Sequence, residues 1–250
     1  MKSINFLFIF IFVFTMGTAQ NADESNSETA PTVYFDEVLI YSYKSPDNEG
    51  EFWIYHNSKT GNFLYIPNDE MIDFVIADSL GNYFIFGDNG HNEKVVTSQR
   101  PILIEVEGAS TKQLPQADDF IDFIALTENR IINQSNISQP NIYSKGYTMH
   151  YKKMMGQQNV FLTDDISVNS NIIYGFNRME GDVRLPVSEL DFYGIFNKNE
   201  LVTHIERDNF LLKLENYGPN PYWAPVADYT YYIQNENGTW VRKTLPLVTE

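Results

Sequence analysis

Short runs of strand-like sequence, separated by turn residues, set the strongest limit on how this chain can fold. From Val33 onward, apolar or alternating runs are interrupted by Gly, Pro, Asn and Asp about every ten residues, a spacing typical of β-sandwiches and barrels. Ile102–Glu107 and Phe210–Leu214 alternate apolar with other residues, as strands with one buried face do. We therefore predict an all-β, mostly antiparallel fold: a sandwich or a strongly curved meander or half-barrel, with at most one or two short helices.

Some runs do not alternate. Phe52–Tyr55 and Tyr83–Phe86 are apolar or aromatic throughout, which indicates strands covered on both faces or strands with functional aromatic residues on the outer face. Val33–Tyr43 is long enough for a central or a bent strand.

Gly-Asn and Asn-Gly pairs predict hairpins. Gly61-Asn62 and Gly81-Asn82 each follow an apolar run and precede an aromatic one, and Asn237-Gly238 lies between two further strand-like runs. Glycine suits short hairpin loops because it adopts positive φ angles without steric cost. We interpret the first two as adjacent hairpins of one sheet, since a propeller would repeat such a unit several times.

Three segments are harder to assign. Asn68–Val75 and Asp118–Thr127 fit both a capped helix and a strand, and both alternatives remain open. Asn216–Pro225 contains three prolines, which predict an extended path without ladder pairing before a strand at Asp228–Gln234.

The N-terminus has the pattern of a secretory signal peptide. Lys2 precedes an apolar run, Phe6–Phe14, and the small residues Gly17-Thr18-Ala19. We predict export to the periplasm or the exterior with cleavage after Ala19. No second apolar span follows and the chain has no Cys for a lipid anchor, so we expect no transmembrane segment after cleavage.

The remaining domain assignment follows from composition. Residues 20–32 are acidic and polar, which predicts a flexible leader. Residues 33–250 are expected to form a single β-rich domain, with a possible sub-boundary near 131–142, where Asn, Gln and Ser are abundant.

Charge and cysteine content exclude several functions. The chain has 33 Asp and Glu against 17 Lys and Arg, and nucleic-acid binding relies on cationic side chains, so we predict no nucleic-acid partner. The absence of Cys excludes disulfides and thiolate chemistry.

Motifs for catalysis are sparse. The sequence has no His-Glu-x-x-His, no Gly-x-Ser-x-Gly and no phosphate-binding glycine loop, and we predict no cofactor and no catalytic residue. His204 and Glu206 lie two apart on an expected strand and are weak candidates for a metal site or an acid/base pair, although a metal needs three or more ligands.

Aromatic residues are the most unusual feature, with 16 Tyr and 18 Phe. Exposed rings stack on sugars or anchor protein partners, whereas half-buried Tyr and Trp are also common in strands. The candidate ligand-binding residues are Trp53, Tyr55, Tyr222, Trp223 and Tyr231.

Three functions follow as hypotheses. The leading one is an exported, non-catalytic binding protein that contacts a glycan or a protein through these aromatics. The alternatives are a periplasmic carrier of an apolar, lipid-like ligand in a concave sheet, and a carboxylate- or metal-dependent hydrolase.

Overall fold

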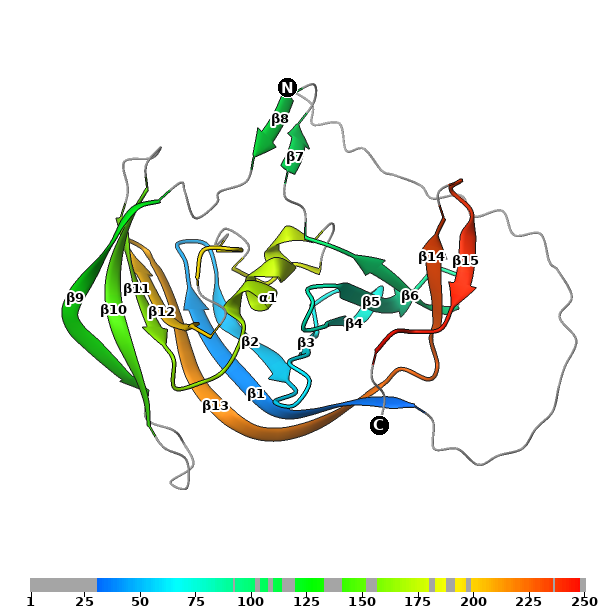
Figure 1. Ribbon diagram of the computed structural model, residues 1–250, viewed down its shortest axis with the longest axis horizontal. Coiled ribbons are helices and arrows are strands. Elements are labelled where there is room, and N and C mark those ends of the chain that lie inside the picture. Colours follow the sequence, from blue (N-terminus) through cyan, green and yellow to red (C-terminus); the bar gives the residue numbers. More distant parts are fainter. Residues whose placement is uncertain are drawn as a thin grey trace, which may run out of the picture.

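The computed structural model describes residues 31–91, 93–101, 104–107, 110–113, 120–132, 141–151, 157–179, 183–187, 192–196, 199–235 and 237–247. They form one sheet of 13 strands, in the order β15-β14-β6-β5-β4-β3-β2-β1-β13-β12-β11-β10-β9, and a separate β7-β8 pair. The large sheet curves around a short helix, α1 (Ser170–Gly175), as Figure 1 shows. The prediction of an all-β fold with at most a short helix is confirmed.

The strands are β1 (Thr32–Lys44), β2 (Glu49–His56), β3 (Phe63–Tyr65), β4 (Ile72–Ala77), β5 (Tyr83–Asp88), β6 (Lys94–Gln99), β7 (Ile104–Glu107), β8 (Ser110–Gln113), β9 (Phe120–Ile132), β10 (Ile142–Tyr151), β11 (Gln157–Thr163), β12 (Leu201–Arg207), β13 (Phe210–Pro225), β14 (Thr230–Gln234) and β15 (Trp240–Lys243). Neighbours in the sheet are antiparallel, as predicted for most of the fold, except that β14 pairs with β6 in parallel.

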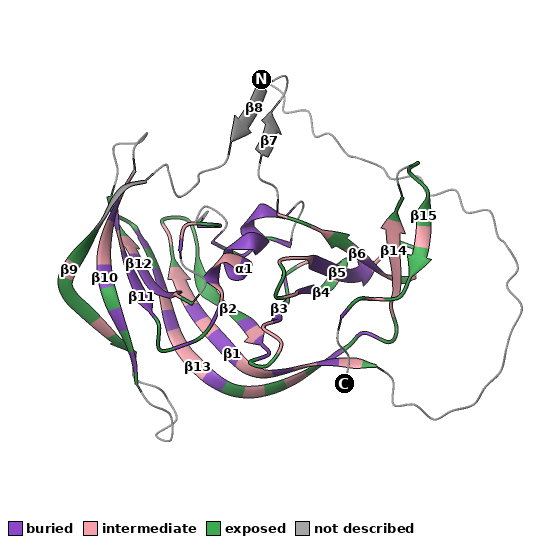
Figure 2. Ribbon diagram, viewed as in Figure 1, coloured by how far each residue is buried: buried purple, intermediate pink, exposed green. Residues whose placement is uncertain are grey.

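Strands β3 to β5 separate two hydrophobic cores. Alternate residues of these strands point to opposite faces: Val75 and Tyr83 belong to the core that includes α1, whereas Ile76 and Phe84 belong to a second core with the N-terminal part of β1. Figure 2 shows α1 and much of β4 and β5 as buried. The uninterrupted apolar run in β5 is thus explained by burial on both faces, one of the two predicted alternatives.

β1 and β13 form a long, bent ribbon that reaches both cores. They pair from Thr32 with Pro225 to Lys44 with Leu211, with register shifts between Phe35 and Glu37 and between Ile40 and Tyr41. Such irregularities bend strands, and both strands follow a long curve in Figure 1. The ribbon therefore contributes to both cores although β1 is continuous.

The prediction that the proline-rich part of β13 lies outside a ladder is wrong. Pro219 and Pro225 pair with Glu37 and Thr32 of β1, so the extended path belongs to the sheet. β12 pairs only with the first residues of β13, up to Lys213. The prolines consequently lie where β13 has a single paired neighbour, a place where a missing N–H costs no ladder bond.

Neither ambiguous segment forms a helix where the structure describes it: residues 68–71 are irregular, and strands follow. Ile72–Ala77 is β4, because its side chains fill the cores on both of its faces. Phe120–Ile132 is β9, which pairs with β10; residues 118–119 lie outside the described part of the chain. The sequence did not predict α1, whose six residues are too few to show a helical period.

The predicted hairpin turns are present. Gly61, Gly81 and Gly238 have φ angles of 71°, 80° and 82°, and they lie in the β2–β3, β4–β5 and β14–β15 connections. β3 also pairs with β4, so the first two hairpins are neighbours in one sheet, as predicted.

The domain predictions are largely outside what the structure describes. The signal segment and the leader up to residue 30 are not among the described residues, and residues 133–140 near the possible sub-boundary are not either. Within the described ranges, no helix is both long and apolar enough to cross a bilayer.

Candidate functional site

A cleft of about 340 Å³ lies at the neighbouring strands β5, β6 and β14. It combines an aromatic ring with side-chain amides, a hydroxyl and a guanidinium group. Its lining residues are Asn82, Phe84, Ser98, Gln99, Arg100, Tyr231 and Pro246. Tyr231 is therefore the predicted aromatic residue that the structure places in a cleft.

Strand pairing brings these residues together. Phe84 faces Ser98 across β5 and β6, and Tyr231 pairs with Val96 in the parallel β6–β14 ladder. The Tyr231 hydroxyl lies 3.1 Å from Ser98 Oγ, and its ring meets the buried Phe84 ring edge-on, with 6.0 Å between centroids. Tyr231 thus has one side anchored on the core, while it also lines the cleft.

The remaining predicted aromatics are not among the residues that line this cleft. Tyr55 and Tyr222 stack at 4.7 Å and pack against the second core, and burial raises the pKa of both hydroxyls. Trp53 and Trp223 are exposed by 42% and 53%, and Trp223 lies against Tyr34 at 4.3 Å. Among the described residues, neither tryptophan makes a ring contact with the three predicted tyrosines.

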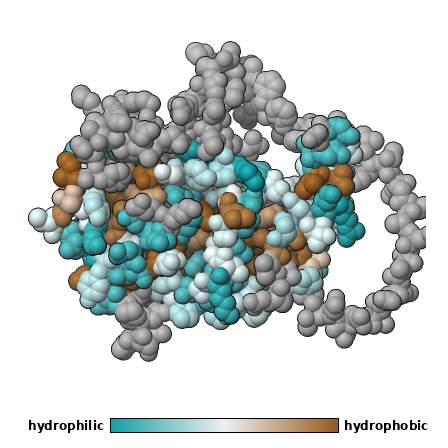
Figure 3. Space-filling view, in the orientation of Figure 1, coloured by the Kyte–Doolittle hydropathy of each residue, from teal (hydrophilic) through white to brown (hydrophobic). Residues whose placement is uncertain are grey.

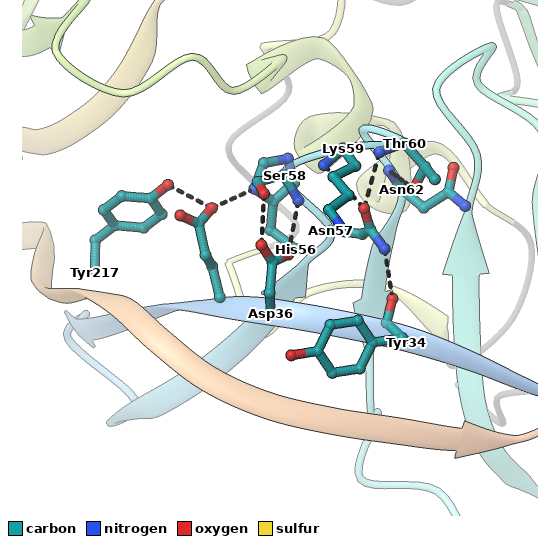
Figure 4. A network of polar contacts seen from close by, with 10 residues as sticks. Tyr34, Asp36, His56, Asn57, Ser58, Lys59, Thr60, Asn62 and Tyr217 are labelled. Carbon is teal, nitrogen blue, oxygen red and sulfur yellow. Dashed lines mark hydrogen bonds and ion pairs between the residues drawn. The ribbon is translucent and has the colours of Figure 1, made fainter. Parts of the chain in front are cut away.

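A buried polar network at the bend of β1 was missed by the sequence analysis. His56 Nδ1 lies 3.0 Å from Glu37 Oε2, and the Tyr217 hydroxyl donates to the same oxygen at 2.5 Å. Figure 4 shows this network reaching the loop after β2, where Asn57 Oδ1 accepts from two backbone amides. A signal was present in the sequence: Glu37 lies two residues before the buried Leu39, so strand alternation places its charge on the same face as a core residue.

Burial and local hydrogen bonds set the ionisation of this network. Burial, and then the hydrogen bond to Glu37, raise the pKa of Tyr217, so its hydroxyl stays a proton donor. Beside it, burial opposes ionisation of Asp36, but bonds from the Ser58 hydroxyl and amide lower the Asp36 pKa overall. The arrangement fixes the loop after β2 to β1, which is a structural role.

One of the two weak metal candidates, Glu206, is paired with a cation. Glu206 Oε1 forms an ion pair with Arg130 at 2.8 Å, and Arg130 also lies over the Phe161 ring, which the His204 ring meets edge-on. Within the described part of the chain, no group of three or more His, Cys, Asp or Glu could hold a metal ion. His204 and Glu206 lie in the same region of the sheet, but Arg130 already pairs with the Glu206 carboxylate, which is therefore not free to bind a metal.

His204 gives a prediction about pH. Burial first, and then Arg130 and Lys213, lower its pKa to about 4 from an ordinary value of 6.5. Between about pH 4 and 6.5, the unfolded chain therefore binds a proton at His204 that the folded chain does not bind. The contribution of this group to the free energy of unfolding is complete above about pH 6.5 and is lost as the pH falls toward 4. We expect about 1–2 kcal/mol of loss from this group between pH 7.5 and 5 in urea titrations.

The matched variants separate His204 from the carboxylates. His204→Gln should show a smaller stability loss over this pH range than the wild type, whereas His91→Gln, at an exposed loop position, should behave like the wild type. An identical pH dependence in His204→Gln and wild type would contradict the assignment.

The concave side of the sheet is filled by protein. Ile173 and Phe176, together with Phe192 and Phe196 further along the chain, belong to the core cluster with β1, β2 and β11 to β13. Figure 1 shows α1 lying in this hollow, and hydrophobic residues show between hydrophilic ones at several places on the face in Figure 3. The hollow that an acyl chain would need is thus occupied by side chains.

No protein family model matches this sequence, and no curated protein shows significant similarity to it. Among solved structures, the chain is similar to one described as "Structure of PNGF-II in C2 space group", with a TM-score of 0.36 and 14% sequence identity. The similarity covers 76% of this chain and 28% of that one, so this chain spans little more than a quarter of its length. A likeness at this level supports no conclusion about function.

Proposed function

We propose that this protein is an exported binding protein that takes a glycan into the cleft between β5, β6 and β14. The observation that carries the proposal is the cleft lining: the Tyr231 ring lies among the polar side chains of Asn82, Ser98, Gln99 and Arg100. Sugars are bound by this combination, because an aromatic ring covers their apolar C–H face while amides and hydroxyls bond their hydroxyl groups. The cleft volume is in the lower range for small-ligand sites.

The other candidate aromatics have different parts in this proposal. Trp53 and Trp223 are exposed, so they are the anchors we propose if a protein partner is also bound. Tyr55 and Tyr222 stack on each other over the core, and we assign them to packing.

The two alternative functions have less support. An apolar carrier would need the hollow that α1 and its neighbours fill. A hydrolase built on His204 and Glu206 would need a free carboxylate, and Glu206 is paired with Arg130.

Tyr231 provides the test. Tyr231→Ala should weaken glycan binding about 5- to 150-fold by removing the stacking surface, which is worth about 1–3 kcal/mol for a ring. Tyr231→Phe keeps the ring and loses only the contact with Ser98, so its affinity should fall about threefold or less. The measurement is a glycan array with purified protein, followed by calorimetry of the best binder.

Trp223→Ala is the matched control, since it removes an exposed ring away from the cleft and should leave glycan affinity unchanged. Circular dichroism checks that each variant folds, because Tyr231 also packs on the second core. Equal affinities of Tyr231→Ala and wild type, or binding of no glycan at all, would refute the proposal. The export part is tested by intact mass: the exported protein should begin at Gln20.

A further inference from the structure

We propose that the cleft selects an acidic sugar, with Arg100 binding the sugar carboxylate. This inference rests on the proposed glycan-binding function and adds the chemical class of the ligand. It starts from the one formally charged side chain among the lining residues.

Arg100 is exposed, and its guanidinium group is not neutralised by a carboxylate among the described residues. Its Nε donates to Asn82 Oδ1 at 3.2 Å. Other cations of this acidic chain do have carboxylate partners, such as Lys94 with Asp73 and Lys213 with Glu215. A cation without such a partner, at the wall of a cleft, is available to an anionic ligand.

A chain of hydrogen bonds orients this guanidinium group. Asp78 Oδ2 accepts from Asn82 Nδ2 at 2.7 Å, and Asp78 Oδ1 accepts from the Asn82 backbone amide at 2.9 Å. Because the Asn82 amide nitrogen is bound to Asp78, its oxygen is directed to Arg100 Nε. Asp78 and Asn82 are thus positioning residues for Arg100.

This orientation leaves the right donors for a carboxylate. With Nε engaged by Asn82, the two terminal nitrogens of Arg100 remain as a fork, and such a fork binds a carboxylate through two parallel hydrogen bonds. A highly charged polyanion fits less well, because the chain as a whole has a net charge of −16 and repels it. A sugar ring with a single carboxylate fits this site, because the carboxylate can bind the two terminal nitrogens of Arg100 while the ring packs on Tyr231.

The probes are the monosaccharide galacturonate, which has one carboxylate, and galacturonate methyl ester, which has the same ring without the charge. Wild-type protein should bind the acid at least tenfold more tightly than the ester, as measured by calorimetry at 50 mM salt. Arg100→Ala should bring this ratio close to one, because it weakens binding of the acid far more than binding of the ester. Arg207→Ala, which removes an exposed arginine from the end of β12, is the matched control and should keep the ratio.

Asn82→Ala should lower the ratio partly, because Arg100 stays but loses its orientation. A wild-type ratio near one, or a ratio that Arg100→Ala does not change, would overturn the inference. If neutral glycans bind through Tyr231 without any preference for the acid, only this inference fails, whereas binding of neither form and of no other glycan refutes the proposed function too. Tighter binding of an acidic peptide than of galacturonate would also overturn it.

Discussion

Gly175→Ala is expected to lower the free energy of unfolding by about 3 kcal/mol. A methyl group on Gly175 would lie 1.8 Å from the Tyr83 hydroxyl oxygen and 2.7 Å from its Cζ. Tyr83 is fully buried and donates to the Ile172 carbonyl at 2.5 Å, so it has no free space to move into. Overpacking costs about 1–3 kcal/mol and a lost buried hydrogen bond a similar amount, while alanine regains about 1 kcal/mol of helix propensity.

A double-mutant cycle with Tyr83→Phe tests the cause. Removing the hydroxyl removes the shortest contact, so the loss in the double variant should be smaller than the sum of the two single losses. Urea denaturation gives all four values. Additive losses would mean that Gly175 is required for another reason, and an unchanged stability of Gly175→Ala would mean that α1 can move away from β5.

Glu37→Ala should have an effect of similar size, a loss of about 2–4 kcal/mol in the free energy of unfolding. The side chains of His56 and Glu37 are exposed by only 4% and 22%, and Glu37 is the shared partner of His56 and Tyr217. Removing the carboxylate leaves the His56 ring and the Tyr217 hydroxyl without this partner at the bend between the cores. Polar groups that are shielded from water and have no hydrogen-bond partner destabilise the folded state.

Glu49→Ala is the matched control, because Glu49 pairs with Lys44 at 3.5 Å with both side chains more than 70% exposed. That exposed pair should contribute less than about 0.5 kcal/mol. Glu37→Gln, which keeps one acceptor, should fall between wild type and Glu37→Ala in thermal denaturation. Similar melting temperatures for Glu37→Ala and Glu49→Ala would show that the bend does not depend on this network.

Local sequence patterns predicted the fold class and the hairpins, because strand alternation and turn glycines depend on neighbouring residues. Gly61 and Gly81 have the positive φ angles that their turns required. The same patterns gave a wrong prediction, or none, where contacts with residues distant in the sequence determine the structure. Pro219 and Pro225 belong to a ladder only because β1 lies beside them, and α1 forms on a hollow built by strands from both ends of the chain.

For the candidate site, the sequence indicated one residue and missed its surroundings. Tyr231 was one of the five aromatic candidates, but the parallel pairing that places it beside Ser98 joins residues 133 positions apart. Arg100 had no signal of its own, since its orientation comes from Asp78 and Asn82 in another hairpin. Glu37 was detectable as a charge on a buried face, and this pattern was not used.

The pairing of β1 with β13 also has a consequence for the rate and order of folding. Thr32 meets Pro225 near the opposite end of the described chain, so β1 cannot obtain its second neighbour until almost the whole polypeptide is present. Folds dominated by such distant contacts form slowly, because a large loop must close before the contacts stabilise it. A chain that folds this late stays unfolded for longer, which is compatible with the export proposed above, since an exported chain can cross a membrane before its sheet closes.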